Sequence, residues 1–218
     1  MTLFGALIIS ALLAFSLSSI PFGYIFAKYL ASGLNLQKEG SGNIGFTNAI
    51  RVVGMRVGVL TLIADIAKGL ISVLIARLLI GSSLGYEGLS FGLESKEAVY
   101  ISLVFAISVI AHCYTPFLKG KGGKGIATGL GCGLACMPLG ILLDLCIFLL
   151  LAFVSKKVSL GSLAAAAGLS LFALMYTQDF LVLVPLACVS LVVIWRHKSN
   201  IKNLLAGTEK SFSIAKKD

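Results

Sequence analysis

Long apolar segments separated by short polar loops run through almost the whole chain. They cover residues 3–26, 57–80, 99–117, 126–154, 158–176 and 180–195. A helix that crosses a bilayer needs about 20 predominantly apolar residues, and most of these segments are close to that length. The pattern predicts an all-α fold, a polytopic transmembrane helical bundle.

The segment at 126–154 is too long for one comfortable crossing and has Pro138 near its middle. Either it is one tilted, kinked helix, or two short helices meet near Pro138. Basic residues favour cytoplasmic loops, and only two helices would bring Lys156 and Lys157 back to the cytoplasm. The charges therefore favour about seven spans over six, with the N-terminus outside and the C-terminus cytoplasmic.

The polar loops differ in charge in the way that this topology requires. The loops at 31–56 and 118–125 are basic, whereas the loop at 81–98 carries three glutamates against one lysine. We therefore expect the acidic loop outside and the basic loops in the cytoplasm. Residues 1–205 would form one transmembrane domain with cytoplasmic-facing loops, and residues 206–218 a basic cytoplasmic tail.

The composition agrees with a membrane protein. Hydrophobic residues make up 58% of the chain, charged residues 12%, and the mean hydropathy is +1.00, whereas soluble domains carry about a quarter charged residues. The five cysteines include no C-x-x-C pair, which argues against a disulfide framework or a zinc site. We expect contact with membrane lipid, and no metal, no cofactor and no nucleic-acid partner.

Four polar constellations interrupt the apolar pattern, and this topology places all of them in the cytoplasm. The first is the glycine-rich loop at 40–51, whose hydroxyl, amide and guanidinium groups can donate hydrogen bonds to an anion. Its glycines let backbone N–H groups turn inward as an anion-binding nest. The alternative is an ordinary flexible loop with solvated polar groups.

The second constellation begins at His112 and continues through Lys119, Lys121 and Lys124, which lie among four glycines. The glycine spacing fits G-x-G-x-x-G, but the motif follows a membrane helix instead of a strand. It is also not a Walker A loop, because Lys124 is followed by a glycine instead of serine or threonine. The segment does predict a cationic turn before a helix N-terminus, which favours anions. A plain basic cytoplasmic loop is the alternative.

The third and fourth constellations flank the last two apolar segments. Ser159 and Ser162 lie at the start of one segment, and Arg196, His197 and Asn200 follow the other. Each has a simpler interpretation. Small residues often serve close helix packing, and a basic tail often serves attraction to anionic lipid.

Other polar residues limit the chemistry. Asp65 and Lys68 are three residues apart within an apolar segment and are expected to pair, whereas the pattern assigns no role to Asp144. Neither His112 nor His197 begins an H-x-x-x-x-D motif, so the common signature of acyl-CoA-dependent transfer is absent. The sequence also lacks a G-x-S-x-G nucleophile elbow.

In this order, the constellations resemble the motifs of the bacterial acyl-phosphate:glycerol-3-phosphate acyltransferase (PlsY) family over nearly the whole chain. The matching segments are 19–23, 40–51, 112–131, 158–162 and 196–209. The specific elements are Ser-Gly-Asn-x-Gly-x-Thr-Asn-x-x-Arg and Lys-Gly-Gly-Lys-Gly. Phe46, Ala111, Gly120 and Gly161 depart from the residues usual in the family, but none of them removes a polar group.

The resemblance implies transfer of a fatty acyl group from acyl phosphate to the 1-hydroxyl of glycerol 3-phosphate, giving lysophosphatidic acid and phosphate in phospholipid synthesis. It also implies a multi-pass protein of the bacterial inner (plasma) membrane with a cytoplasmic active site, linked to an upstream enzyme that forms acyl phosphate. An acyl phosphate is already activated, so a covalent intermediate is unnecessary. Positioning and electrostatic stabilisation would supply most of the acceleration.

The expected site residues come from all four constellations. The expected catalytic residues are Ser41, Arg51, His112, Lys124, Ser162, His197 and Asn200. The expected residues for substrate or phosphate binding are Gly42, Asn43, Gly45, Thr47, Asn48, Lys119, Lys121, Gly122, Gly123, Gly125, Thr128, Ser159 and Arg196. One phosphate is expected at Ser41, Arg51, Lys124 and the backbone at 42–45, and the other at Lys119, Ser162, His197 and Asn200. Either His112 or a phosphate oxygen would take the hydroxyl proton.

Two other classes of protein also fit the cationic loops. An anion transporter would use them as a phosphate pathway, but transporters usually place their sites near the bilayer midplane between inverted repeats. This chain shows no internal repeat, and its donors lie at one interface. A lipid-binding regulator would use the basic tail alone. The sequence leaves the acyl-chain preference and the oligomeric state open.

Overall fold

The computed structural model describes residues 1–31, 33–85, 93 and 96–212. Within them the fold is helical and contains no strand, as the sequence predicts. The helices are α1 (Leu3–Ser19), α2 (Phe22–Leu30), α3 (Phe46–Val52), α4 (Met55–Ser83), α5 (Ala98–Cys113), the short 3-10 helix η1 (Pro116–Leu118), α6 (Ile126–Cys136), α7 (Pro138–Ser155), α8 (Val158–Ala173), α9 (Phe180–Arg196) and α10 (Lys198–Leu205).

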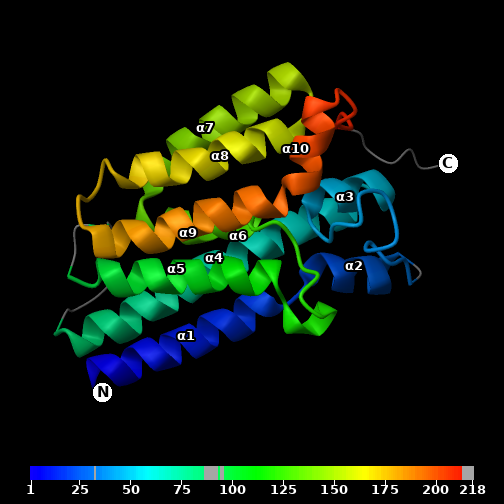
Figure 1. The fold of residues 1–218 in the computed structure, drawn as a ribbon. Helices are drawn as coiled ribbons and strands as arrows, with labels where there is room; N and C mark the ends of the chain where they lie inside the picture. The colour runs from blue at the N-terminus through cyan, green and yellow to red at the C-terminus, as the bar shows by residue number, and fades with distance from the viewer. Residues whose placement is uncertain (32, 86–92, 94–95, 213–218) are drawn as a thin grey trace.

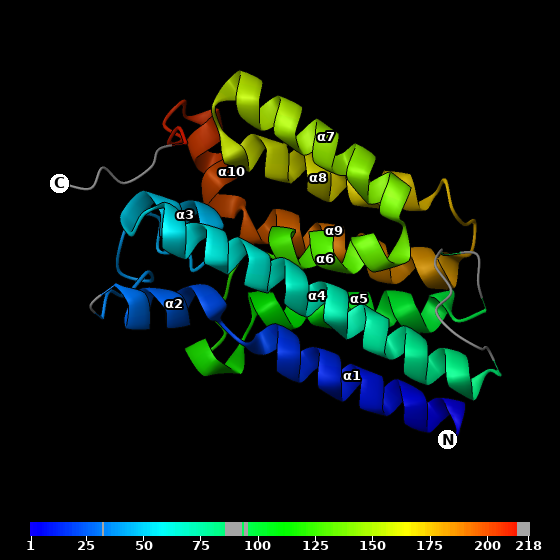
Figure 2. The ribbon, with the colours of Figure 1, turned by 180° about the vertical axis from the view of Figure 1, so that it is seen from behind.

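The long helices lie roughly side by side, with the shorter α6 among them (Figure 1, Figure 2). Helix α4 packs against α1 and α6, α5 against α1 and α9, and α8 against α7 and α9. Helices α2, α3 and α10 gather at one end of the bundle, and the N-terminus lies at the other end. We call the first end, which includes residues 40–52, 119–125, 156–159 and 197–212, the polar end.

Several helices have the length and apolarity of membrane spans. Among the described residues, four helical stretches qualify, and a fifth does so if α9 and α10 count as one bent span; α6 and α8 are shorter apolar helices. The expected break near Pro138 is confirmed, because α6 ends at Cys136 and α7 begins at Pro138. Seven crossings and the orientation of the chain stay predictions.

The sequence suggested one helix over the apolar segment at 3–26. In the structure the helix is broken between α1 and α2. Pro21 has no N–H to donate, and hydrocarbon supplies no replacement partner for backbone carbonyls left free at a break. Two side chains from other parts of the protein donate hydrogen bonds to these carbonyls. Lys68 Nζ donates to Ile20 O at 2.8 Å, and Thr115 Oγ1 donates to Ser19 O at 2.6 Å. Beyond the break, α2 continues at the polar end (Figure 1).

Helices α4 and α6 approach closely where a glycine removes the side chain between them. A Cβ at Gly69 of α4 would overlap the carbonyl oxygen of Thr128 on α6. Small residues at such contacts allow membrane helices to pack backbone against backbone. This contact holds α6 in the middle of the bundle.

At the other end of the bundle, a buried ion pair joins α4 to the start of α5. Arg77 donates to Glu97 at 2.5 Å and to the carbonyl oxygen of Ala135 at 2.9 Å. Glu97 was expected in a solvent-facing acidic loop, but it is only 1% exposed. The other glutamates of that loop, Glu87 and Glu94, lie outside the described residues.

We expect Glu97→Ala to lower the stability of the folded protein strongly, because removing one partner of a buried ion pair costs about 3–5 kcal/mol. Thermal unfolding of the purified protein in detergent measures this effect. The exposed neighbour Lys96 provides the matched control, since Lys96→Ala removes a charge at the same turn without touching the pair. Equal unfolding temperatures for the two variants would contradict the role of the pair.

Candidate active site

A cavity of about 750 Å³ opens at the polar end and continues between the helices. Its outer half is polar, and its inner half is apolar. The polar side chains of the outer half are Ser41, Asn43, Thr47, Asn48, Arg51, Asp65, His112, Lys124, Ser159, Ser162, His197, Ser199, Asn200, Asn203, Glu209 and Lys210, and Asp144 and Ser190 add polar side chains to the rest of the lining. The apolar lining includes Leu62, Ile66, Ile126, Leu130, Ile141, Leu145, Phe148, Leu149, Ala165, Ala166, Leu169, Val189 and Val193.

The side chain of Asn48 organises the loop that precedes α3. Its Oδ1 accepts from the backbone N–H of Ser41 at 2.8 Å. Its Nδ2 donates to the carbonyl oxygens of Leu36, Glu39 and Asn43, at 3.2, 3.0 and 2.8 Å. Asn48 is 1% exposed, and these bonds use both hydrogens of its amide group and one acceptor position of its oxygen. Asn48 therefore shapes the loop, whereas the sequence assigned it to direct phosphate binding.

The expected backbone nest is also partly used inside this loop. The N–H of Ser41 donates to Asn48, and the N–H of Gly42 donates to Glu39 O at 2.9 Å. Gly42 does not line the cavity, while Asn43 and Gly45 do. The donors that the loop offers to a ligand are therefore mainly side chains, with Arg51 as its cation.

A chain of hydrogen bonds crosses the polar half of the cavity. Lys124 Nζ donates to Asn200 Oδ1 at 2.6 Å, and Asn200 Nδ2 donates to Glu209 Oε1 at 2.7 Å. Ser159 Oγ donates to the same carboxylate oxygen at 2.6 Å. These four side chains come from the turn before α6, from α10, from the segment after it and from α8. The chain of bonds thus fixes the walls of the cavity relative to one another.

The charges in this chain of bonds are strongly perturbed. Burial lowers the pKa of Lys124 to about 8, against the raising effect of Glu209 and together with the nearby Arg196 and Arg51. Burial tends to raise the pKa of Glu209, but the hydrogen bonds from Ser159 and Asn200 and the charge of Lys124 outweigh it, so the pKa lies below its usual value. Near neutral pH, Lys124 is a cation that loses its proton more readily than an ordinary lysine.

Arg196 holds the glycine-rich turn in front of α6. Its guanidinium donates to the carbonyl oxygens of Gly122 and Gly123, at 2.7 and 3.0 Å. Gly125 then enters α6 at a φ of 90°, and a Cβ there would crowd Val109. A residue other than glycine would be strained at this φ. The turn therefore aims Lys124 into the cavity.

The two histidines occupy different surroundings in the cavity wall. His112 is buried at the end of α5, with Nδ1 3.7 Å from Asp65 Oδ1, and Asp65 also pairs with Lys68 at 2.8 Å, as the sequence predicts. His197 follows α9, and its Nδ1 lies 2.8 Å from Val193 O. That contact makes Nδ1 the donor and leaves Nε2 able to accept a proton.

The apolar half of the cavity extends toward the expected position of lipid. It is bounded by α4 and α6 on one side and by α7, α8 and α9 on the other. Leu149 of α7 contributes to the lining although it is 54% exposed. An exposed lining residue in a membrane-spanning helix indicates that the cavity opens sideways between the helices.

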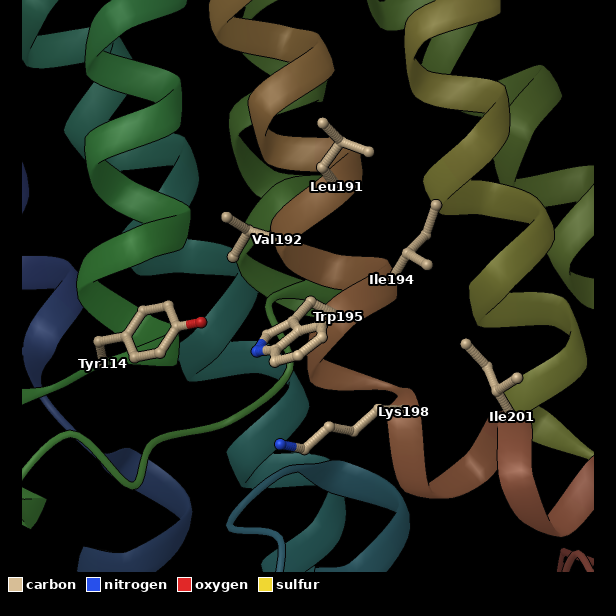
Figure 3. A pocket seen from close by; sticks show the side chains of 7 residues that line it. All are labelled: Tyr114, Leu191, Val192, Ile194, Trp195, Lys198 and Ile201. Atoms are coloured by element: carbon tan, nitrogen blue, oxygen red, sulfur yellow. The ribbon is translucent and has the colours of Figure 1, made fainter.

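A second, shallower hollow of about 470 Å³ lies on the outer side of α9 (Figure 3). It contains Tyr114, Trp195 and Lys198, and the Lys198 ammonium group is 4.8 Å from the centre of the Trp195 ring. Tryptophan, tyrosine and lysine are enriched where a membrane protein meets the headgroup region. This combination of side chains is typical of a helix end near the headgroup region.

The structure brings the four constellations together around one cavity. All of the expected catalytic residues line it: Ser41, Arg51, His112, Lys124, Ser162, His197 and Asn200. Among the expected binding residues, Asn43, Gly45, Thr47, Asn48, Gly125 and Ser159 also line it. Seven others do not, namely Gly42, Lys119, Lys121, Gly122, Gly123, Thr128 and Arg196.

The residues outside the lining have other positions. The side chains of Lys119 and Lys121 are exposed on the surface of the turn. Thr128 is fully buried where α6 contacts α4. None of the seven lines the cavity, so a direct contact between these residues and a ligand stays a prediction. Sequence reasoning missed Glu209, the one acidic residue of the matching segment at 196–209.

The donors of the cavity suit anions better than metal ions. Among the residues that the structure describes, no cluster of three or more His, Cys, Asp or Glu side chains is arranged to hold a metal. The fold and the cavity together define a helical membrane protein with a cationic site that is continuous with an apolar groove.

Comparisons with known proteins identify the family. The family model for glycerol-3-phosphate acyltransferase matches residues 8–207. A glycerol-3-phosphate acyltransferase of Geotalea daltonii is 38% identical over 199 residues, covering 91% of this chain and 94% of the relative. One of Trichlorobacter lovleyi is 41% identical over 199 residues with the same coverage. The chain belongs to the glycerol-3-phosphate acyltransferase family.

Solved structures agree with this assignment. The crystal structure of PlsY (YgiH), an integral membrane glycerol 3-phosphate acyltransferase, in its glycerol 3-phosphate form matches with a TM-score of 0.82 at 33% identity, covering 95% of this chain and 96% of that chain. The lysophosphatidic acid form of the same enzyme matches with a TM-score of 0.79. Together with the apolar helices, these matches show that the chain is a membrane protein.

The charge of Lys124 predicts a pH dependence. A lysine whose pKa is lowered to about 8 is charged below that pH and loses its charge as the pH rises through it. We expect kcat/KM for an anionic substrate to fall above pH about 8, because kcat/KM reports the free enzyme. In Lys124→Arg the fall should vanish, since a guanidinium stays charged. A Lys124→Arg profile with the same fall would contradict the assignment, whatever its absolute rate.

Proposed function

We propose that the protein transfers a fatty acyl group from acyl phosphate to the 1-hydroxyl of glycerol 3-phosphate, releasing lysophosphatidic acid and phosphate. The observation that carries this proposal is the single cavity with a cationic polar half and an apolar groove that opens toward lipid. Family membership supports glycerol 3-phosphate as the acceptor. The polar half suits the two phosphates, and the groove suits the acyl chain of a donor that arrives from the membrane.

The cavity favours acyl transfer without a covalent intermediate. Arg51 and Lys124 are cations that line it together with Ser41, and Ser162, His197 and Asn200 add donors nearby. We assign the first group to one phosphate and the second to the other, and we leave out Lys119 because it lies outside the cavity. Donors that are fixed before the substrates bind stabilise charge without reorganising.

The proton balance needs no protein base. The acceptor hydroxyl attacks the carbonyl carbon of the mixed anhydride, the bond to the phosphate oxygen breaks, and the proton leaves on the released phosphate. A donor phosphate oxygen lies next to the attacked carbonyl in any bound pose. By contrast, His112 Nδ1 faces Asp65, and His197 has only Nε2 available. We therefore favour the phosphate oxygen over a histidine as proton acceptor.

The topology that fits this reaction has the polar end in the cytoplasm of a bacterial cell, at the inner membrane. Lys156 lies at the polar end, where its carbonyl oxygen accepts from the N–H of Phe212 at 2.9 Å. Lys124 and Asn200 meet at the same end. Basic residues gathered at one end favour that side as the cytoplasm. Seven crossings, with the N-terminus outside, are consistent with α6 and α7 as separate spans.

Purified protein supplied with palmitoyl phosphate and glycerol 3-phosphate should form lysophosphatidic acid, detected by mass spectrometry. Palmitoyl-CoA should be inert as donor, because the H-x-x-x-x-D motif is absent. Arg51→Ala should lose about 100-fold or more of the activity, since a charge-assisted contact to phosphate is removed. Lys202→Ala, which removes an exposed cation of α10 outside the cavity, is the matched control. No product in the wild type, or phosphate flux into liposomes instead, would overturn the proposal.

Replacing both histidines tests the route of the proton. If a phosphate oxygen accepts it, the double variant His112→Asn, His197→Asn should lose less than about tenfold in kcat, whereas a general base contributes about 100- to 10,000-fold. Single-turnover rates at saturating substrates isolate the chemical step. A loss of 100-fold or more, with a folded variant, would assign the proton to a histidine.

A further inference from the structure

One carboxyl group lies within the apolar half of the cavity. Asp144 of α7 is 3% exposed and lines the groove beside Ile141, Leu145 and Phe148. Its Oδ1 is fully buried and has no hydrogen-bond partner among the described residues. The other buried aspartate of the cavity, Asp65, pairs with Lys68, whereas Asp144 forms no ion pair within the part of the chain that the structure describes.

The position of Asp144 is well inside the groove. It lies eleven residues before the end of α7 at Ser155, which corresponds to about 16 Å along a helix that rises 1.5 Å per residue. On the facing helix α8, a Cβ at Gly168 would overlap Asp144 Oδ1. The carboxyl group is therefore wedged against α8, beside the place where Leu169 joins the lining.

A carboxyl group without partners disfavours an apolar neighbour. Burying a polar group without a hydrogen bond is unfavourable in either protonation state. A short acyl chain leaves space beside the other carboxyl oxygen, Oδ2, which is not among the fully buried unpaired atoms, and water in that space can hydrogen-bond to it. A longer chain fills that space with methylene groups and removes the water.

We propose that Asp144 determines the acyl-chain length that the cavity accepts, by disfavouring chains whose tails extend past its carboxyl group. The proposal rests on the proposed function, because it takes an acyl donor to occupy the groove. It makes Asp144 a specificity-determining residue and assigns it no part in the chemical step.

The test compares kcat/KM for lauroyl, myristoyl, palmitoyl and stearoyl phosphate. In Asp144→Leu the ratio of the longest to the shortest donor should rise about tenfold, because the unpaired polar group is gone. Asp144→Asn should keep the wild-type ratio, since an amide also needs hydrogen-bond partners. Cys146→Leu is the matched control on α7, because Cys146 is exposed and does not line the cavity.

The outcomes separate this inference from the proposed function. A wild type that makes no lysophosphatidic acid from any acyl phosphate defeats the proposed function. An active wild type whose ratio equals that of Asp144→Leu defeats the role of Asp144 and leaves the function standing.

A second measurement uses only the wild type, in case Asp144→Leu does not fold. Palmitoyl phosphates that carry one hydroxyl group at successive positions should show a maximum in kcat/KM at one position, where the hydroxyl group can pair with Asp144. A uniform fall at all positions would overturn the inference.

Discussion

Hydrocarbon offers no hydrogen bonds, and this constraint explains where most of the strongly polar groups in the spans are found. The backbone carbonyls of Ile20 and Ser19, at the break before Pro21, accept from Lys68 and Thr115. Lys68 in turn pairs with Asp65, and Arg77 pairs with Glu97. Because polar groups in a bilayer must be satisfied within the protein, each irregularity requires a partner from another helix or turn. Those partners hold the break between α1 and α2 in place and so determine the shape of the polar end.

The sequence predicted the features that depend on length and charge. The break near Pro138 followed from a segment too long for one span, and the gathering of the four constellations followed from the basic loops. The break at Pro21 was missed because the apolar run continues through it. The role of Asn48 was also out of reach, since an asparagine in a glycine-rich loop has the same donors whether it binds a ligand or three carbonyl groups of its own loop.

A carboxylate inside the proposed site for two phosphates is unexpected until its contacts are considered. Glu209 accepts from Ser159 and Asn200, and Asn200 accepts from Lys124. Without Glu209, burial and the charges of Arg51 and Arg196 would weaken the hold of Lys124 on its proton further. The carboxylate thus favours the charged form of Lys124 and holds the amide of Asn200 in place. Sequence reasoning overlooked it because negative charge near a phosphate site is read as repulsion, whereas here it organises the donors.

The same reasoning separates the two buried aspartates of the cavity. Asp65 stands at the polar half, beside His112 and paired with Lys68, so its charge is balanced by the protein whether or not a substrate is bound. Asp144 stands in the groove, where α8 offers a glycine instead of a donor. The surroundings of Asp144 therefore change with whatever fills the groove, while those of Asp65 stay the same. A polar group whose hydrogen-bond partners depend on the molecule in the groove can discriminate between acyl chains. A group whose partners all come from the protein cannot.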